Sequence, residues 1–489
     1  MKSTATRSPY LRLRIDGSAP GRKVTGLDVI AAVMREYEAG QLPAGCRLPP
    51  VRVLQHQLGI AKNTVNRAYE ELVARGVVDN RSRLGYFILA RHQGRRRSAP
   101  VAAACAALFD TRAPNFRVAS APGSLNLGSA FIDNALLPRD RLAQCLAAVL
   151  RKPGFPHDYT VQGFAPLRAL IAQRLARRGV PANPDDVIIT TGSQQAIDLV
   201  ARALRKRSIA TENPAYGIAK RLFEICRLEP VPLTLDPFVG IDLATWRAAI
   251  AKSRPAALYL TPNFHNPTGY SYSTLELTGI LELSREFQFG LLEDDWGSDM
   301  LSFSDFRPPL RALGGDNVLY MNSFTKKLLP SLRIGYLLAN ERTRPALLEV
   351  KHVSTLGSAT ISEILLFEFL SRGYYDTHLR SLQAELDRRY RICLETLAAV
   401  MPDGVRWSTP GGGPILWLEV PRAVDLEKLA GRLAARKVLI SRPLNACFFG
   451  KPHLHGTRIG FAYLPVAAMQ QALDILSDEI RRQLRRGAA

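Results

Sequence analysis

The chain has 489 residues, more than a single hydrophobic core normally holds, so we expect two or more domains. Its formal charge of +22 is unevenly spread, because residues 1–100 carry 18 Lys+Arg against 7 Asp+Glu. Six scattered cysteines without a Cys-x-x-Cys pair, and no signal-peptide core or apolar run of about 18 residues, argue against a secreted or membrane-spanning protein. We expect a cytoplasmic protein with a polyanionic partner, nucleic acid ahead of membrane, although composition alone leaves a solubilising charge equally open.

Residues 24–90 have the pattern of a small domain with three helices followed by two strands. The apolar spacing and the glycines at helix ends predict a helix ending before Gly40, helices over Val51–Leu58 and Asn63–Arg75, and strands over Val77–Asp79 and Tyr86–Leu89. Two short helices around a glycine turn, the second opening with polar and basic residues, are typical of a helix-turn-helix. A generic small three-helix domain is the plainer alternative.

The third helix opens with a polar and basic turn that suits contact with DNA. Its candidate DNA-binding residues are Lys62, Asn63, Thr64, Asn66 and Arg67, and Arg52 of the preceding helix is placed to reach a phosphate. Arg81 and Arg83 would lie on a wing beside the groove.

Three consecutive stretches, Leu42–Pro49, Val51-Arg52 and Leu58–Tyr69, closely resemble the winged helix-turn-helix of GntR-type bacterial repressors. The resemblance implies binding to a specific site on double-stranded operator DNA. Two features depart from the family pattern. Pro50 stands where a small hydroxyl residue usually caps the second helix, and the wing lacks the usual second glycine.

The rest of the chain reads as a linker and one large domain. A charge cluster, an alanine-rich stretch and Pro, Ser and Gly residues predict a linker over residues 91–123. Beyond it, apolar strands alternate with amphipathic helices, as in Val187–Thr190, Ala257–Leu260, Gly290–Leu292 and Val318–Met321. This alternation predicts an α/β domain with a mainly parallel sheet. We therefore expect a winged domain over residues 20–90 and an α/β domain over residues 124–486.

A lysine that can form a Schiff base follows one of these strands. The segment Ser323-Phe324-Thr325-Lys326-Lys327 is followed by Arg333, and Ser323 and Arg333 offer a hydroxyl and a fork-shaped cation to a phosphate. A Ser-x-x-Lys alone is often a solvated strand end. Lys326 and its neighbour Lys327 are both candidates for this lysine.

Further candidate cofactor residues lie upstream, each after a strand. Ser193 and Gln194 open a helix after a glycine turn, where exposed N–H groups and the helix dipole suit a phosphate. Tyr216 can stack on an aromatic ring, although a loop tyrosine is otherwise usually packing. Asn266 can aim its amide into a cleft, and Asp294 can keep a pyridine nitrogen protonated. Strand alternation should point Asp294 and Asp295 to opposite faces of the sheet.

From about Leu125 to Gln483 these elements together resemble a fold-type I aminotransferase, which binds pyridoxal 5'-phosphate (PLP). The resemblance assigns Lys326 to the Schiff base, Asp294 to the pyridine nitrogen and Asn266 to the ring oxygen. It assigns Tyr216 to ring stacking, and Ser193, Gln194, Ser323 and Arg333 to the phosphate. Arg458, in Thr-Arg-Ile-Gly-Phe-Ala, matches the arginine that binds the carboxylate of an amino compound.

Two positions depart from the aminotransferase pattern. Trp296 stands where the family has a tyrosine that donates to the ring oxygen, and Ile218 leaves no second arginine near Tyr216. The pair His453 and His455 suggests a metal, but a His-x-His in a Gly/Pro-flanked loop without a Cys or acidic companion is usually a surface or pocket-rim pair. We expect no metal site.

A GntR-like domain followed by an aminotransferase-like domain is the arrangement of MocR-type transcriptional regulators. That resemblance implies a PLP-bound, domain-swapped homodimer that associates with the nucleoid when bound to DNA. It also implies that an amino compound, or PLP itself, alters DNA binding without sustained turnover. A true PLP transaminase with an appended DNA-binding domain is the main alternative, and a cofactor-free dimerisation scaffold is a third.

Overall fold

The computed structural model describes residues 24–82, 84–90, 123–152, 158–300, 307–441 and 446–487. The chain divides into two compact units, Met1–Phe116 and Arg117–Ala489. Arg83 and, except for Gly123, the linker expected over residues 91–123 lie outside the described residues. None of the described helices is long and apolar enough to cross a membrane.

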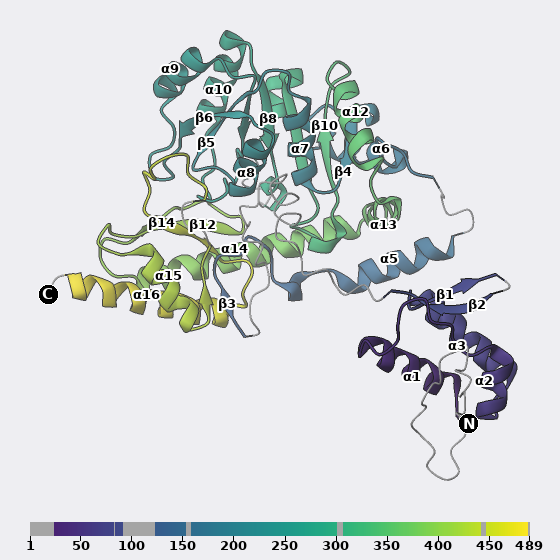
Figure 1. Ribbon diagram of the computed structural model, residues 1–489. Helices are drawn as coiled ribbons and strands as arrows, with labels where there is room; N and C mark the ends of the chain where they lie inside the picture. Colours follow the sequence, from purple (N-terminus) through teal and green to yellow (C-terminus); the bar gives the residue numbers. More distant parts are fainter. Residues whose placement is uncertain are drawn as a thin grey trace, which may run out of the picture. The chain divides into compact units, whose positions relative to one another are not determined.

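The first unit contains the three helices and the hairpin that the sequence predicts (Figure 1). Its elements are α1 (Gly26–Glu38), α2 (Val51–Leu58), α3 (Lys62–Ala74), β1 (Val78–Arg81) and β2 (Gly85–Ile88). The strands extend nearer to the tip of the hairpin than expected, because pairing continues to Arg81 opposite Gly85. Gly85 has φ +104°, a backbone conformation that favours glycine.

Helix ends in the first unit follow the local sequence. Thr25 and Asp28 form a capping box at the start of α1, in which the Thr25 N–H donates to Asp28 at 2.8 Å. Pro50 precedes α2 without a side-chain hydrogen bond, as its missing hydroxyl predicts, and Gly59 ends this helix in the left-handed conformation. Tyr69 ties α3 to the segment before α2, since its hydroxyl donates to the Pro49 carbonyl at 2.9 Å.

The second unit is built on a seven-stranded sheet (Figure 1). The strands lie in the order β4 (Val187–Thr190), β10 (Gly335–Leu338), β9 (Val318–Ser323), β8 (Gly290–Asp294), β7 (Ala257–Leu260), β5 (Ser208–Asn213) and β6 (Glu229–Thr234). All neighbouring pairs are parallel except the two that involve β10. The expected mainly parallel sheet is therefore confirmed, with one antiparallel strand.

Helices cover both faces of this sheet, which explains why its central strands are apolar on both sides. One face packs against α7 (Ser193–Ala203), α8 (Gly217–Ile225) and α12 (Arg344–Thr355). Two groups of helices cover the other face. Beside β4 it packs against α6 (Ala165–Ala176) and α13 (Thr360–Ser371), and α5 (Arg139–Arg151) lies next to α13. Toward β6 it packs against α9 (Leu243–Ser253), α10 (Thr274–Phe287) and α11 (Leu310–Gly314). The carboxyl ends of the parallel strands stay free for a site.

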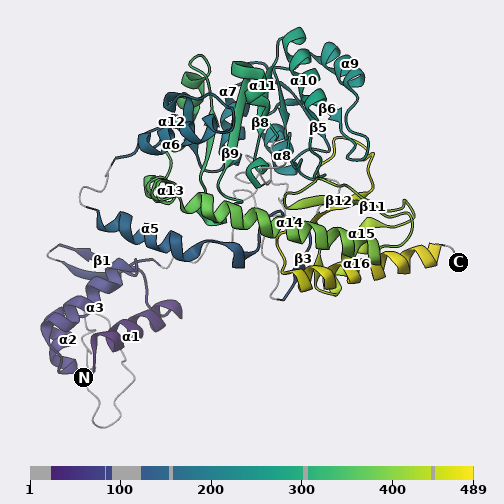
Figure 2. The same ribbon diagram turned by 180° about the vertical axis from the view of Figure 1, so that it is seen from behind.

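A smaller α/β layer completes the second unit. It comprises β11 (Arg406–Trp407), β12 (Ile415–Glu419) and β14 (Gly456–Gly460) in one sheet, β3 (Leu125–Asn126) and β13 (Val438–Leu439) in another, and the helices α15 (Leu426–Ala435) and α16 (Val466–Gly487). The long helix α14 (Tyr374–Val400) runs from the large sheet to this layer in both views (Figures 1 and 2). The smaller layer has its own apolar core, which includes Leu416, Leu429 and Leu473.

A close backbone approach fixes the segment after β3 against β14. The Gly460 N–H donates to the Leu127 carbonyl at 2.6 Å, and a side chain on Gly460 would collide with the Ser129 carbonyl oxygen. Only glycine fits there. Because of this contact, residues 127–131 lie beside the strand that carries Arg458.

Candidate cofactor and DNA sites

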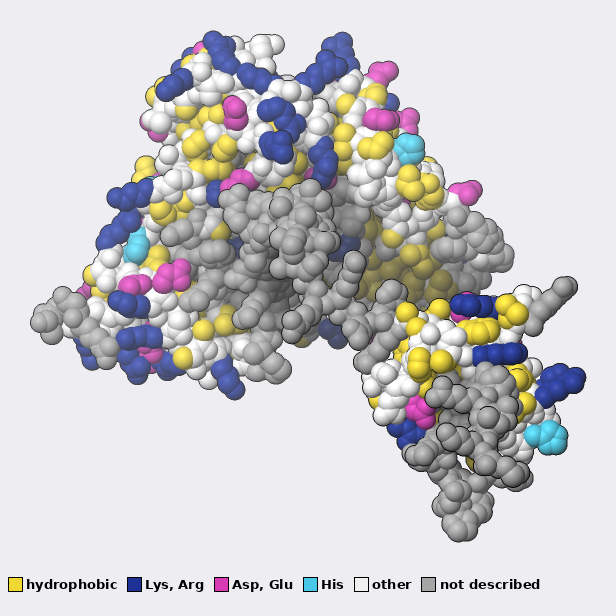
Figure 3. Space-filling view, in the orientation of Figure 1, with side chains coloured by type: hydrophobic (Ala, Val, Ile, Leu, Met, Phe, Trp, Pro, Cys, Tyr) yellow, Lys and Arg dark blue, Asp and Glu magenta, His cyan; other side chains and the backbone are white. Residues whose placement is uncertain are grey.

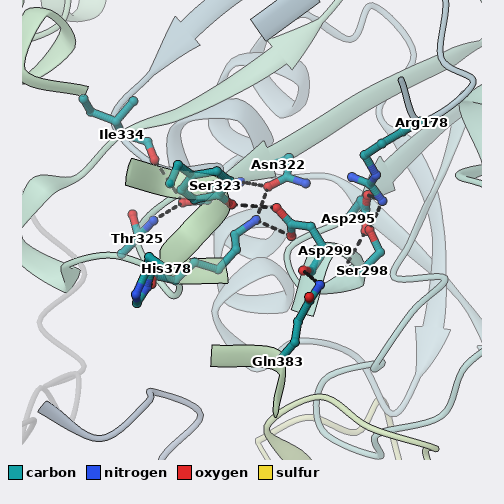
Figure 4. A network of polar contacts seen from close by, with 12 residues as sticks. Arg178, Asp295, Ser298, Asp299, Asn322, Ser323, Thr325, Ile334, His378 and Gln383 are labelled. Atoms are coloured by element: carbon teal, nitrogen blue, oxygen red, sulfur yellow. Dashed lines mark hydrogen bonds and ion pairs between the residues drawn. The ribbon is translucent and has the colours of Figure 1, made fainter. Parts of the chain in front are cut away.

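The two consecutive lysines after β9 have different surroundings. The Lys327 ammonium donates to Asp299 and to the Asn322 side chain, both at 2.6 Å, and Figure 4 shows these two acceptors in one polar network. Lys326 forms no such ion pair among the described residues. Its ammonium instead lies 3.5 Å from the centre of the Phe131 ring. Lys327 therefore has a structural role in this unit, and Lys326 is the lysine whose amine can react with a cofactor.

The electrostatic environment of Lys326 favours a neutral amine. Burial and the nearby Arg458 and Arg333 guanidinium groups lower the pKa of Lys326 to about 7, although Asp294 opposes the shift. A neutral amine is the nucleophilic form of a lysine. Lys326 thus has the chemistry expected of a lysine that attacks a carbonyl group.

Asp294 lies at the end of β8 with one carboxylate oxygen unused. The Tyr259 hydroxyl donates to Oδ2 of Asp294 at 2.8 Å, whereas the buried Oδ1 has no hydrogen-bond partner among the described residues. Burial raises the pKa of Asp294 to about 7, and the bond from Tyr259 opposes the rise. Asp295 instead accepts from Tyr320 at 2.6 Å on the other face of the sheet, in agreement with strand alternation.

Candidate phosphate-binding groups meet where β4, β9 and β10 come together. The Arg333 guanidinium donates to the Thr191 carbonyl at 2.9 Å and lies against Gly192, where a Cβ atom would be 3.0 Å from it. Gly192 has φ +76° and precedes α7 without a side-chain cap, so the first N–H groups of that helix are free to bind an anion. Gln194 contributes a buried Oε1 that has no partner in the described part of the chain.

Ser323 and Arg333 belong to one loop. The Ser323 hydroxyl donates to the Ile334 carbonyl at 3.2 Å and accepts from the Thr325 N–H at 3.1 Å. Arg333 has φ +51°, a strained backbone conformation for a side chain of this size. The turn between β9 and β10 therefore holds Ser323, Lys326 and Arg333 at one end of the sheet.

The candidate carboxylate-binding residue faces the same site. Arg458 donates to the Asn266 Oδ1 at 2.7 Å and to the Gly128 carbonyl at 3.1 Å, and burial lowers its pKa. Tyr216 lies beside the same charges: burial raises its pKa to about 12, Asp294 adds to the rise, and Arg458 opposes it. The structure thus gathers Lys326, Asp294, Asn266, Tyr216 and Arg458.

Three contacts in this site were missed in the sequence. Tyr259 could have been found, because it pairs with Leu292 in the parallel ladder and therefore faces the same side as Asp294 two residues later. Phe131 and the Gly128 carbonyl carry no local signal. Both reach the site only because the smaller layer packs residues 127–131 beside β14.

The residues that depart from the aminotransferase pattern are also resolved. Trp296 is buried among Phe264, Met300 and other apolar side chains, and its indole N–H has no acceptor among the described residues. Ile218 is exposed. His453 and His455 each place Nε2 against a backbone carbonyl, at 3.0 and 2.8 Å, so both imidazoles have structural partners.

The residues present fit a phosphorylated pyridine. The unpartnered Oδ1 of Asp294 suits a protonated ring nitrogen, the lysine amine suits an aldehyde, and the glycine turn with Arg333 suits a phosphate. Neutral apolar ligands would leave these charges uncompensated in a buried site.

In the first unit, the candidate DNA-binding residues lie along α2 and α3. Arg52, Lys62, Asn63 and Arg67 are exposed, whereas Thr64 and Asn66 are half-buried, and Thr64 packs close to Gly26. Figure 3 shows separate Lys and Arg side chains on the visible face of this unit. Arg81 is partly neutralised, since it pairs with Asp79 at 3.2 Å and stacks on Phe87.

Comparison with known families identifies both units. Residues 141–476 match the family "Aminotransferase class I and II", and residues 25–88 match "Bacterial regulatory proteins, gntR family". The chain belongs to the class I and II aminotransferase family. Its fusion to a gntR-type domain is the architecture of MocR-type regulators.

Relatives of both kinds support this assignment. The chain is 27% identical to the probable rhizopine catabolism regulatory protein MocR of Rhizobium meliloti, over 90% of each chain. It is 28% identical to the uncharacterized HTH-type transcriptional regulator YdcR of Escherichia coli, over 82% of this chain and 87% of YdcR. The crystal structure of LysN, an alpha-aminoadipate aminotransferase from Thermus thermophilus, superimposes with a TM-score of 0.69 at 27% identity, over 75% of this chain and 94% of LysN. This MocR-type regulator therefore keeps the fold of a PLP-dependent family.

The lowered pKa of Lys326 makes a prediction for the cofactor-free protein. An amine-reactive acylating reagent should label Lys326 with a midpoint near pH 7, because the neutral amine is present above its pKa of about 7. Arg458→Met removes a repelling positive charge, so the midpoint should move to higher pH. Peptide mass spectrometry across a pH series measures it.

The matched control is Arg342→Met, which removes an exposed arginine from elsewhere in the same unit. It should leave the labelling midpoint unchanged. An Arg458→Met midpoint equal to that of the unaltered protein would contradict the assigned environment of Lys326.

Proposed function

We propose that this MocR-type regulator binds PLP at Lys326, senses an amino compound through Arg458, and changes its affinity for operator DNA in response. The observation that carries the proposal is that one site holds both Lys326, whose pKa is lowered to about 7, and Asp294, whose buried Oδ1 has no hydrogen-bond partner among the described residues. When bound, PLP supplies a reactive aldehyde and an electron-withdrawing ring. Each of the surrounding side chains then has a distinct task.

Asp294 holds a proton at the pyridine nitrogen, and Tyr259 orients that carboxylate through its 2.8 Å hydrogen bond. Arg333, Ser323, Ser193 and Gln194 would bind the phosphate, and Tyr216 would hold the ring. Asn266 donates to the ring oxygen through its amide nitrogen, because its carbonyl oxygen already accepts from Arg458. Arg458 would bind the carboxylate of an amino compound, which would place that compound's amine beside Lys326.

The response reaches DNA through the first unit, with Arg52, Lys62, Asn63, Thr64, Asn66 and Arg67 at the interface. We propose a cytoplasmic, domain-swapped homodimer, because the resemblance to MocR extends over 90% of both chains. Two half-sites would then be read by two copies of α3.

A catalytic role is the second candidate, and one observation favours it. The chain is 30% identical to a 2-aminoadipate transaminase of Thermus thermophilus over 65% of this chain and 80% of that protein. Against it stands Trp296, which lacks the phenol of the usual tyrosine. Incubation with amino donors and a keto acid separates the two roles, since a regulator completes few turnovers per subunit.

Borohydride reduction of the PLP-loaded protein should attach the cofactor to Lys326 and to no other residue. The adduct should disappear in Lys326→Ala and persist in Lys327→Met, because Lys327 is held by Asp299 and Asn322. Absorbance and fragment mass spectra of the peptide that contains both lysines measure this. An adduct on Lys327 would overturn the assignment.

Arg67→Ala should weaken binding to an operator selected from random duplex DNA, because Arg67 is an exposed cation in the first turns of α3. A lost phosphate contact should lower the salt slope by roughly 1, whereas a lost base contact should cost about 1–3 kcal/mol at one base position. Fluorescence anisotropy at several salt concentrations distinguishes them.

The control for this experiment is Arg75→Ala, at the other end of α3, where Arg75 pairs with Glu71 at 2.9 Å. Its operator affinity should match that of the unaltered protein. Equal losses in the two variants would mean that the orientation of α3 on DNA is wrong.

A further inference from the structure

A cavity lies on the α6 face of the sheet, between α6 and the first turns of α14. Its volume is about 560 Å³, within the range of roughly 300–1,000 Å³ that small-molecule sites occupy. Asn322, Phe324 and Tyr336 line its sheet side. None of the residues that line it belongs to the proposed cofactor site. The cavity is therefore a separate site to account for.

Aromatic side chains form one wall of this cavity. The ring of Phe324 lies 6.0 Å from that of Tyr336 and 5.5 Å from that of Tyr375, and Ile171, Leu175 and Leu379 add aliphatic surface. Rings packed at these distances offer both faces and edges to a further ring. The wall suits the apolar body of a ligand.

The lining of the cavity is also cationic, and the Arg174 guanidinium lies 4.7 Å from the centre of the Tyr375 ring. Four arginines line the cavity, Arg174, Arg177, Arg178 and Arg380, against two aspartates, Asp299 and Asp376. Arg174 pairs with Asp376 at 2.7 Å, Arg178 with Asp295 at 3.2 Å, and Lys327 neutralises Asp299 at 2.6 Å.

Two of the four arginines remain to balance a ligand charge. Arg177 and Arg380 are exposed and form no ion pair with any described residue. They line the cavity beside its aromatic wall with two positive charges that no described carboxylate neutralises. A guanidinium group in such a position binds a carboxylate through two parallel hydrogen bonds.

We propose that this cavity binds a small organic carboxylate with an aromatic body, the ring against Phe324, Tyr336 and Tyr375 and the carboxylate between Arg177 and Arg380. This site differs from the one at Arg458, which offers a single guanidinium already bound to Asn266 and to the Gly128 carbonyl. The proposal stands whether or not the protein binds PLP.

Two residues that line the cavity also bind the Lys327 ammonium. Asp299 and Asn322 both line the cavity and both accept from Lys327, and the Asn322 Oδ1 also accepts from the Ser323 N–H at 2.6 Å (Figure 4). Tyr375 donates to the second oxygen of Asp299 at 2.8 Å. A ligand against Tyr375 and Asn322 therefore contacts the groups that set the backbone just before Lys326, which provides a contiguous route of coupling.

Binding of 2-naphthoate to the full-length protein tests the proposal by isothermal titration calorimetry. The acid should bind, and 2-naphthamide, which has the same shape without the charge, should bind about tenfold more weakly. Arg177→Gln with Arg380→Gln should weaken the acid at least as much and leave the amide unchanged. Leu379→Trp, which fills the cavity and removes no charge, should weaken both ligands.

Two control variants separate this cavity from other sites. Arg391→Gln, an exposed arginine further along α14, and Arg458→Met, at the proposed amino-compound site, should both bind 2-naphthoate as the unaltered protein does. Equal binding by the double arginine variant, or loss of binding in Arg458→Met, would overturn the proposal. In the first case the cavity does not use its arginines, and in the second the acid occupies the other site.

A separate measurement tests whether the cavity is coupled to Lys326. Saturating 2-naphthoate should change the rate at which Lys326 is acylated in the cofactor-free protein by about fivefold or more. Asn322→Ala should abolish this change, measured at 2-naphthoate concentrations that saturate the variant by calorimetry. An unchanged acylation rate would limit the cavity to binding and remove its link to Lys326.

Discussion

The structure of the second unit depends on how two adjacent ammonium groups are accommodated at the end of β9. A buried lysine requires either an ion pair or the loss of its charge. Lys327 takes the first solution, with Asp299 and Asn322 as acceptors on the α6 face. Lys326 is closer to the second, since burial and two guanidinium groups lower its pKa to about 7. Lys327 thus has a structural role, whereas Lys326 keeps a reactive amine.

Lys326 can serve a cofactor site only because the sheet brings the other polar residues of that site close to it. Asp294 ends β8, Asn266 lies in the loop after β7, and Arg333 precedes β10, which is separated from β8 by β9, the strand that Lys326 follows. These strands therefore bring their polar residues to one edge of the sheet. Arg458 comes from the smaller layer and is bound to Asn266 at 2.7 Å. A movement between the two layers would therefore alter the charges that depress the pKa of Lys326, which is a physical basis for sensing a carboxylate.

Much of this was predictable from the sequence, and the exceptions have a common cause. The helix-turn-helix and the strands follow from local periodicity and glycine turns, whereas the gathering of Lys326, Asp294 and Arg458 was implied by the resemblance to fold-type I aminotransferases. Strand alternation also predicted that Asp294 and Asp295 separate. Phe131 and the Gly128 carbonyl were missed because their positions depend on packing between segments about 330 residues apart in the chain. The contacts of Lys327 were missed because nothing local marks Asp299 as its partner.

The central claim is that occupancy of the Lys326 site changes affinity for DNA, and the most direct measurement is operator affinity with and without an amino compound. Fluorescence anisotropy on the PLP-loaded full-length protein, with a panel of amino acids, should find at least one that changes affinity about fivefold or more. Arg458→Met and Lys326→Ala should each lose the response while retaining basal binding. A response that survives in both variants, or continuous consumption of the effective amino acid with a keto acid, would contradict the account.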